Sequence, residues 1–172
     1  MSDALAQAGA RSRPFALAMV LTCLWLPLAS VTHSGAVREA RFCVRVVDGD
    51  TIVLDHGEKV RLIGVDTPEL HHPVKPVQYF AREARDRVRV LAGGQRVWLE
   101  YDQTRRDRYG RTLAYVFLAD GTLLNLRLIE EGYGFALTKY PFRGDYMRRF
   151  RRAEQSAREG DRGLWLTRES RP

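Results

Sequence analysis

"RFCVRVVDGDTIVLDHGEKVRLIGVD", residues 41–66, is the stretch that decides the fold. Three runs rich in β-branched and other apolar residues, 41–47, 51–55 and 59–66, are separated by the breaks DGD and HGE. Alternating short runs with glycine-bearing breaks are typical of antiparallel strands joined by hairpins. The stretch therefore predicts a three-stranded meander.

The remaining chain adds helices and two further strands. Residues 77–91 place apolar side chains at helical spacing and are followed by the stop AGG,. Strands are expected over 96–102 and 111–120, and helices over 121–132 and 145–165, the last ending near Gly160. This order predicts a mainly β protein with α-helices: an OB-fold five-stranded β-barrel, with one helix between strands three and four and two helices packed on it.

The N-terminus has the order of a secretory signal peptide. Arg11 and Arg13 precede an uncharged run over residues 15–30, which gives way to small and polar residues,. We expect residues 1–36 to be a signal peptide cleaved after Ala36, so that the protein is exported to the periplasm or the cell exterior. The alternative is an uncleaved helix that anchors it to a membrane. Residues 37–166 then form the folded domain, and 167–172 a C-terminal tail.

Charge and cysteine content limit the classes of partner. The chain has a net charge of +7, and about +6 remains without residues 1–36. A basic excess on a small domain favours an anionic partner: nucleic acid, phosphate or a membrane surface. Of the two cysteines, Cys23 lies in the leader, so the mature chain keeps Cys43 alone and forms no internal disulfide,.

Acidic and arginine side chains cluster near the ends of the predicted strands. Taken singly, each has a structural explanation. Asp48-Gly49 is a common hairpin dipeptide, and Asp66 is suited to closing a turn before Thr-Pro,. Glu69 suits a solvated surface, and Arg61 alternates with apolar residues as a solvent-facing strand residue does. No single residue identifies the chemistry.

The combination indicates phosphodiester cleavage assisted by one hard cation. Such a cation takes oxygen ligands, which Asp50, Asp66 and the Thr67 carbonyl supply,. Guanidinium groups donate to phosphate oxygens as these gain negative charge, a role open to Arg61 and Arg111. A nearby carboxylate activates the attacking water.

Three motifs resemble those of the staphylococcal nuclease-like (thermonuclease) family: VDGDT at 47–51, RLIGVDTPE at 61–69 and DRYGRTLAYVF at 107–117. The similarity extends from about Arg41 to Trp165. The resemblance implies an OB-fold barrel and a Ca²⁺-dependent nuclease. Such an enzyme cuts DNA and RNA internally and leaves 3′-phosphate and 5′-hydroxyl ends.

The resemblance also implies roles for individual residues. The calcium ligands are Asp50, Asp66 and Thr67, and Asp48 is left as the acid of the turn. The catalytic residues are Glu69, which activates water, and two arginines that hold the scissile phosphate, Arg61 and Arg111. Substrate-binding residues are Arg108, Tyr109 and Tyr140, although Thr138 stands where a further aromatic residue is expected.

The expected partners are DNA and RNA, preferably single-stranded, with no protein partner and a monomeric state. The main alternative is an OB-fold module that binds nucleic acid without cutting it. A second is an exported protein that binds phosphate or a membrane surface. Retention of all five charged side chains favours catalysis over both: Asp50, Arg61, Asp66, Glu69 and Arg111.

Overall fold

The computed structural model describes residues 38–71, 74 and 76–166. The expected signal peptide, residues 1–36, and the expected tail, residues 167–172, lie outside the described residues. Within the described part, no helix is long and apolar enough to span a membrane.

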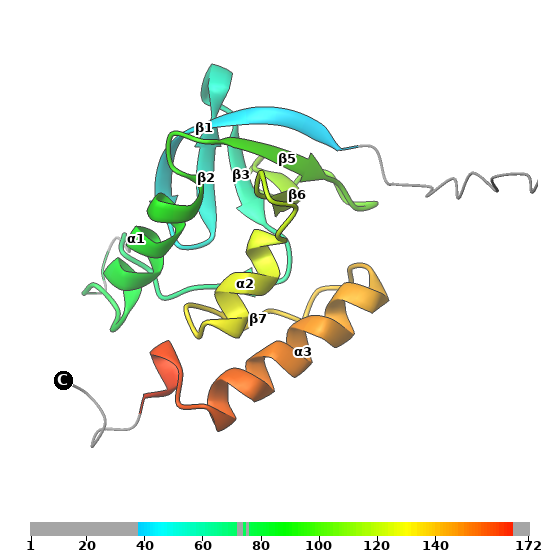
Figure 1. Cartoon of the computed structure of the whole chain (residues 1–172). Helices are drawn as coiled ribbons and strands as arrows, with labels where there is room; N and C mark the ends of the chain where they lie inside the picture. Colours follow the sequence, from blue (N-terminus) through cyan, green and yellow to red (C-terminus); the bar gives the residue numbers. More distant parts are fainter. Residues whose placement is uncertain (1–37, 72–73, 75, 167–172) are drawn as a thin grey trace, which may run out of the picture. The chain divides into compact units, whose positions relative to one another are not determined.

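A closed five-stranded barrel forms the body, in the order β1-β2-β3-β6-β5 (Figure 1). All neighbouring strands pair antiparallel except β3 and β6, which pair parallel. The barrel confirms the predicted fold class. Its strands are β1 (Glu39–Asp48), β2 (Thr51–Leu54), β3 (Lys59–Leu62), β5 (Arg96–Glu100) and β6 (Thr112–Phe117).

The β1–β2 hairpin turns at Gly49 and Asp50. Asp48 pairs with Thr51, so Gly49 and Asp50 form the two-residue loop between the strands. Asp48 is the last residue of β1, and Asp50 lies in the loop itself. A Cβ atom on Gly49 would lie 2.8 Å from the Cβ of Ala84 and 2.9 Å from the Oγ1 of Thr67. Only glycine lets the turn approach these residues so closely.

The third predicted run, residues 59–66, is divided in two. β3 ends at Leu62, and a turn at Ile63 and Gly64 leads into β4 (Val65–Asp66). Gly64 has a φ of +73° and lies against the ring of Phe150, where a Cβ atom would be 2.7 Å from the Cε2 carbon. β4 therefore leaves the barrel and pairs with the short strand β7 (Phe135–Ala136), which the sequence did not predict.

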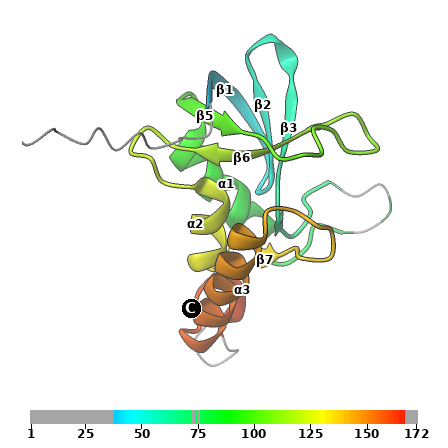
Figure 2. The same ribbon diagram turned by 90° about the vertical axis from the view of Figure 1, so that its right-hand side faces the viewer.

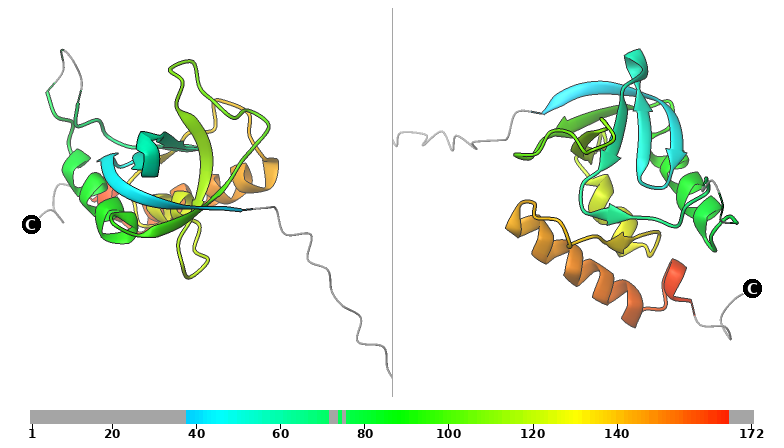
Figure 3. Two further views of the ribbon diagram at one scale, coloured as in Figure 1. Left: turned by 90° about the horizontal axis from the view of Figure 1, so that it is seen from above. Right: turned by 180° about the vertical axis from the view of Figure 1, so that it is seen from behind.

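Three α-helices accompany the barrel, α1 (Ala81–Ala92), α2 (Leu124–Glu130) and α3 (Gly144–Glu159), together with two short 3₁₀ helices, η1 (Asp55–Gly57) and η2 (Gly163–Trp165). α1 begins four residues later than predicted because Phe80, at its N-cap, has a φ of +68°. Figures 2 and 3 show α2 and α3 on the side of the barrel away from the tip of the β2–β3 hairpin.

One buried polar side chain ties α2 to the barrel. Asn125 is 0% exposed, accepts from the Val116 amide at 2.9 Å, and donates to the carbonyls of Ile63 at 2.9 Å and Ala114 at 3.3 Å. It thereby satisfies backbone groups of β6 and of the turn before β4. The orientation of β4 follows from this contact.

Replacing Asn125 by leucine should lower the free energy of unfolding by about 3 kcal/mol, because the Val116 amide and the Ile63 carbonyl lose a partner at roughly 1–3 kcal/mol each. Chemical denaturation at neutral pH measures the loss. The control is Glu130→Gln, a substitution at an exposed residue of the same helix. It should change the free energy of unfolding by less than about 0.5 kcal/mol,. Equal stability of the two variants would contradict the role of Asn125.

Candidate functional site

The site is built on a buried carboxylate in the β1–β2 turn. Asp50 is 7% exposed. Its Oδ1 accepts from the Thr51 hydroxyl at 2.9 Å, and its Oδ2 accepts from the amide and the hydroxyl of Thr67, both at 3.0 Å. A buried carboxylate needs such donors to remain charged. Two segments of the chain, the turn and the residues after β4, are joined here.

Arg61 of β3 holds Asp50 and Asp66 together. Its Nη1 lies 3.1 Å from the Oδ2 of Asp50, and its Nη2 lies 3.0 Å from the Oδ1 of Asp66. Nη1 also donates to the carbonyl of Val65 at 2.6 Å. One guanidinium therefore pairs with both of the predicted metal-ligating carboxylates and offsets one of their two negative charges.

Two further carboxylates, Asp48 and Glu69, lie within electrostatic range. Partial burial raises the pKa of Asp66, Arg61 opposes this rise, and the charges of Asp50 and Glu69 add to it. Burial also raises the pKa of Asp48, again with contributions from Asp50 and Glu69. The Oδ1 of Asp48 is buried without a hydrogen-bond partner among the described residues. His71 and a hydrogen bond from the Leu70 backbone oppose this rise in the pKa of Asp48.

Glu69 is exposed, and the backbone that carries it is held by Gln78. The Glu69 amide donates to the Oε1 of Gln78 at 3.0 Å, and the Gln78 amide donates back to the Glu69 carbonyl at 3.1 Å. These two bonds close the loop that begins after β4. The acid is fixed at its backbone while its carboxylate faces solvent.

Arg111 belongs to a compact turn organised by Asp107. The Oδ2 of Asp107 accepts from the Arg111 Nε at 2.7 Å, and its Oδ1 accepts from the amides of Tyr109 and Arg111, both at 2.9 Å. Among the described residues, neither terminal nitrogen of Arg111 makes a hydrogen bond or ion pair. The turn therefore orients the guanidinium and leaves its outer edge available.

Strand pairing brings the segments that carry Arg61 and Arg111 together. In the parallel β3–β6 pair, Arg61 lies opposite Leu113, which is two residues after Arg111. Arg111 itself lies just before β6, which begins at Thr112. The two predicted catalytic arginines thus come from adjacent chain segments.

The predicted substrate-binding residues lie on exposed loops. The Arg108 Nη2 donates to the Tyr109 hydroxyl at 2.5 Å, and Tyr109 is 68% exposed. Tyr140 is 60% exposed, and its ring lies 5.8 Å from the Lys139 ammonium. Residues 67–71, 101–111 and 137–143 project to the same side of the body in Figure 2. The structure gives no hydrogen bond between Tyr140 and the other predicted site residues.

The donor set is that of a hard cation. In the described part of the chain, no three His, Cys, Asp or Glu side chains are grouped to hold a metal. The carboxylates of Asp50 and Asp66 nevertheless meet at the same guanidinium, that of Arg61. Two carboxylates completed by a backbone carbonyl and water suit Ca²⁺ or Mg²⁺ and do not suit a soft metal.

Sequence reasoning missed the supporting role of Gln78. Asp107 and Arg111 around Tyr109 and Gly110 are readable from the sequence as a charged turn, and the structure has that turn. No comparable signal marked Gln78, which lies nine residues from Glu69 across a loop. Asp48 was interpreted as the acid of the turn, whereas it lies beside the turn and faces the other carboxylates.

Comparison with known proteins gives one consistent family. The family model for the staphylococcal nuclease homologue matches residues 59–167. Thermonuclease of Staphylococcus hyicus is 39% identical over 142 residues, which cover 81% of this chain and 83% of the relative. Thermonuclease of Staphylococcus intermedius is 42% identical over 130 residues, which cover 74% of this chain and 76% of the relative. Endonuclease YncB of Bacillus subtilis (strain 168) is 38% identical over 125 residues, which cover 70% of this chain and 59% of the relative.

Replacing Gln78 by alanine should free the Glu69 amide, because its hydrogen-bond acceptor is removed while the chain remains folded. We expect amide hydrogen exchange at Glu69, measured by NMR, to accelerate several-fold with little change in the exchange of barrel amides. Gln78→Glu retains an acceptor oxygen and is the matched control. Unchanged exchange at Glu69 in the alanine variant would contradict the proposed clamp.

Proposed function

The chain belongs to the family of staphylococcal nuclease homologues and is a nuclease, and from this premise we propose that it is a Ca²⁺-dependent endonuclease that hydrolyses DNA and RNA. The relatives named thermonuclease and endonuclease support the reaction class. The single observation that carries the proposal is the arrangement of Arg61 between Asp50 and Asp66, beside the exposed Glu69.

Glu69 is the proposed proton acceptor for the attacking water. Its carboxylate is exposed, and its backbone is held at both the amide and the carbonyl. A general base must be positioned before it is useful, because proton transfer requires hydrogen-bond distance to the reacting water. The Gln78 clamp supplies that positioning.

Arg111 and Arg61 are the proposed donors to the scissile phosphate. Asp107 occupies the Nε of Arg111 and directs the guanidinium, so its two terminal nitrogens are suited to bidentate donation,. Arg61 is occupied by Asp50, Asp66 and the Val65 carbonyl in this structure. A phosphate therefore competes with carboxylates for Arg61 and meets no such competition at the outer edge of Arg111.

Asp50, Asp66 and the Thr67 carbonyl are the proposed ligands of Ca²⁺. When bound, the cation supplies positive charge beside the carboxylates and polarises phosphate oxygens. Thr67 contributes in a second way, since its amide and hydroxyl fix the orientation of Asp50. One proposed ligand residue, Thr67, thus orients the carboxylate of another, Asp50.

We propose single-stranded nucleic acid as the preferred substrate, with cleavage that leaves 3′-phosphate and 5′-hydroxyl ends. Exposed Tyr109 and Tyr140 on neighbouring loops are suited to stacking on unpaired bases, and Arg108 is suited to a flanking phosphate,. The same proposal includes a monomer exported through the N-terminal leader. N-terminal sequencing of exported protein, beginning near Val37, supports export, whereas Met1-bearing protein in the membrane fraction supports the anchor.

Cleavage should require a divalent cation, because Asp50, Asp66 and Glu69 repel one another and Arg61 alone offsets them. We expect cleavage of single-stranded DNA and RNA with Ca²⁺ and its loss in excess chelator. The melting temperature should rise on adding Ca²⁺ with a nucleotide, since ligands that bind the folded state stabilise it. Undiminished cleavage in chelator, without a thermal shift, would overturn the calcium assignment.

Replacing Glu69 by glutamine should lower single-turnover cleavage by roughly 100-fold or more, because the proton acceptor is lost while its shape is kept. Affinity for the oligonucleotide should stay equal or become slightly tighter, since one negative charge is removed. Glu130→Gln removes the same charge from an exposed site on α2 and is the control. If wild type binds tightly but cuts no faster than Glu69→Gln, the protein is a non-catalytic OB-fold binding module.

A further inference from the structure

A second basic surface lies beside the site, in a groove between β1 and α1. The groove has a volume of about 500 Å³ and is lined by Val44, Arg45 and Val46 of β1, Arg85 and Arg89 of α1, and the turn at 93–94. No acidic residue lines it. We call it the β1–α1 groove. Its lining is both cationic and partly apolar, with Val44 52% exposed.

Two arginines of α1, Arg85 and Arg89, line the groove. They share one flank of the helix because they are four residues apart, and Arg82, three residues before Arg85, extends that flank beyond the lining residues,. Seven residues of helix span about 10 Å, at 1.5 Å per residue. One strand of a stacked nucleic acid places about three phosphates in that length, at roughly 3.4 Å each.

Most of this positive charge is not used by the fold. Arg45 and Arg89 make no hydrogen bond or ion pair through their side chains among the described residues, and Arg85 pairs with its neighbour Asp86 at 2.8 Å. Arg87 lies on the other flank of α1, and its Nε and Nη2 donate to the two carboxylate oxygens of Glu131, both at 2.6 Å. Arg87 has a structural role that accounts for it, whereas Arg45 and Arg89 have none.

The groove begins next to the site. Val46 lies two residues before Asp48, and Gly49 approaches Ala84, which is one residue before Arg85. The same short segments therefore carry the catalytic turn and the first part of the groove. A strand that leaves the site past this turn meets the groove without crossing another element.

We propose that the β1–α1 groove binds the sugar-phosphate backbone of the nucleic-acid strand on one side of the scissile phosphate. The inference rests on the proposed function, since it names a further binding surface for the same substrate. Guanidinium groups donate to phosphate oxygens, and the exposed valines contact sugars and bases without selecting sequence. The groove accordingly favours long substrates over short ones.

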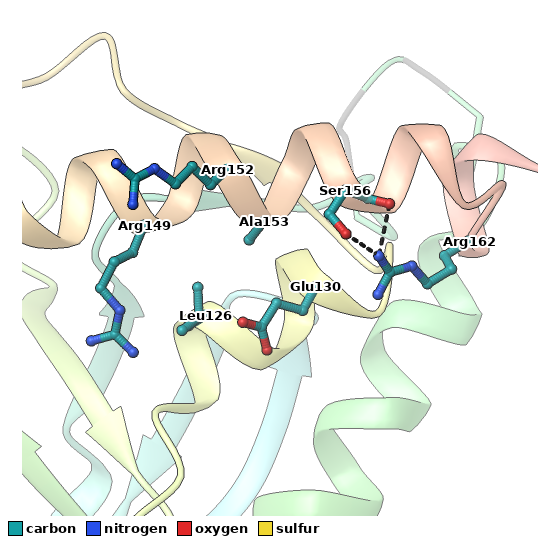
Figure 4. Close-up of a pocket in the computed structure, with 7 residues that line it drawn as sticks. All are labelled: Leu126, Glu130, Arg149, Arg152, Ala153, Ser156 and Arg162. Atoms are coloured by element: carbon teal, nitrogen blue, oxygen red, sulfur yellow. Dashed lines mark hydrogen bonds between the residues drawn. The ribbon is translucent and has the colours of Figure 1, made fainter.

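The chain offers a matched control on α3. A pocket of about 400 Å³ between α2 and α3 is lined by Arg149, Arg152 and Arg162, but it also contains Glu130 (Figure 4). Arg162 is held there by the Ser156 carbonyl at 2.7 Å. No described residue lines both this pocket and the β1–α1 groove. Substitutions on α3 therefore remove equal charge from a different surface.

The test compares two triple variants that each remove three positive charges: Arg45→Gln, Arg85→Gln and Arg89→Gln in the groove, and Arg148→Gln, Arg149→Gln and Arg152→Gln on α3. Each is assayed on a trinucleotide and on a strand of about 16 nucleotides, the upper site size of an OB-fold. Cleavage gives kcat and KM, and fluorescence anisotropy gives affinity over a range of salt concentrations. Circular dichroism and thermal melting check that both variants fold.

The groove variant should keep the wild-type kcat/KM on the trinucleotide and lose affinity for the long strand. The slope of log K against log salt for the long strand should become shallower by about 2, at roughly 0.7 per lost phosphate contact. The α3 variant should lose less affinity for the long strand. Equal losses in the two variants, or an unchanged slope in the groove variant, would overturn the inference.

A further outcome separates this inference from the proposed function. If wild type cleaves neither substrate, the nuclease proposal fails, and the anisotropy measurements alone decide whether the groove binds nucleic acid. If the groove variant binds both strands as wild type does but loses binding to vesicles of anionic lipid, the groove is a membrane contact and the inference is wrong.

Discussion

The buried carboxylate of Asp50 is the constraint on which the site depends. A charged group at 7% exposure is unfavourable unless donors surround it, and here they come from Thr51, Thr67 and Arg61,. These residues belong to the β1–β2 hairpin, the segment after β4, and β3. Satisfying one carboxylate therefore fixes the relative positions of three segments. Loss of the charge at residue 50 would free Thr67 and leave Arg61 with Asp66 and the Val65 carbonyl.

Arg61 connects stability with reactivity. In this structure its guanidinium pairs with both Asp50 and Asp66 and offsets one of their two negative charges. Arg111 is arranged differently, since Asp107 takes its Nε and leaves the terminal nitrogens. The two arginines are thus unequal. In the proposed function, Arg111 donates to a phosphate through terminal nitrogens that are already available, whereas Arg61 exchanges carboxylate contacts for phosphate contacts.

The sequence predicted the barrel well because its signals are local. Hairpins at 48–50 and 56–58 and the apolar alternation around them are properties of neighbouring residues. The division of residues 59–66 into β3 and β4 was not predicted, since it depends on Gly64 packing against Phe150, far along the chain. β7 was missed for the same reason: two residues become a strand only because β4 lies beside them.

Site residues, too, were predicted where the sequence signal is local and missed where it is not. Acids and arginines were found from motif spacing, and the structure brings Asp50, Arg61, Asp66 and Thr67 into direct contact. Gln78 was not found, because a side chain that binds the backbone of another residue leaves no pattern in composition or period.

Net charge alone did not separate the arginines by role. Arg41 is engaged with Asp55 at 2.8 Å and Glu58 at 2.6 Å, and Arg87 is engaged with Glu131. Arg45 and Arg89 carry the same charge without such partners among the described residues. A net charge of +7 therefore becomes informative about function only after the arginines that bind carboxylates are set aside. Arg45 of β1 and Arg85 and Arg89 of α1 line one groove near the turn that carries Asp50, where a bound polyanion would offset their mutual repulsion,.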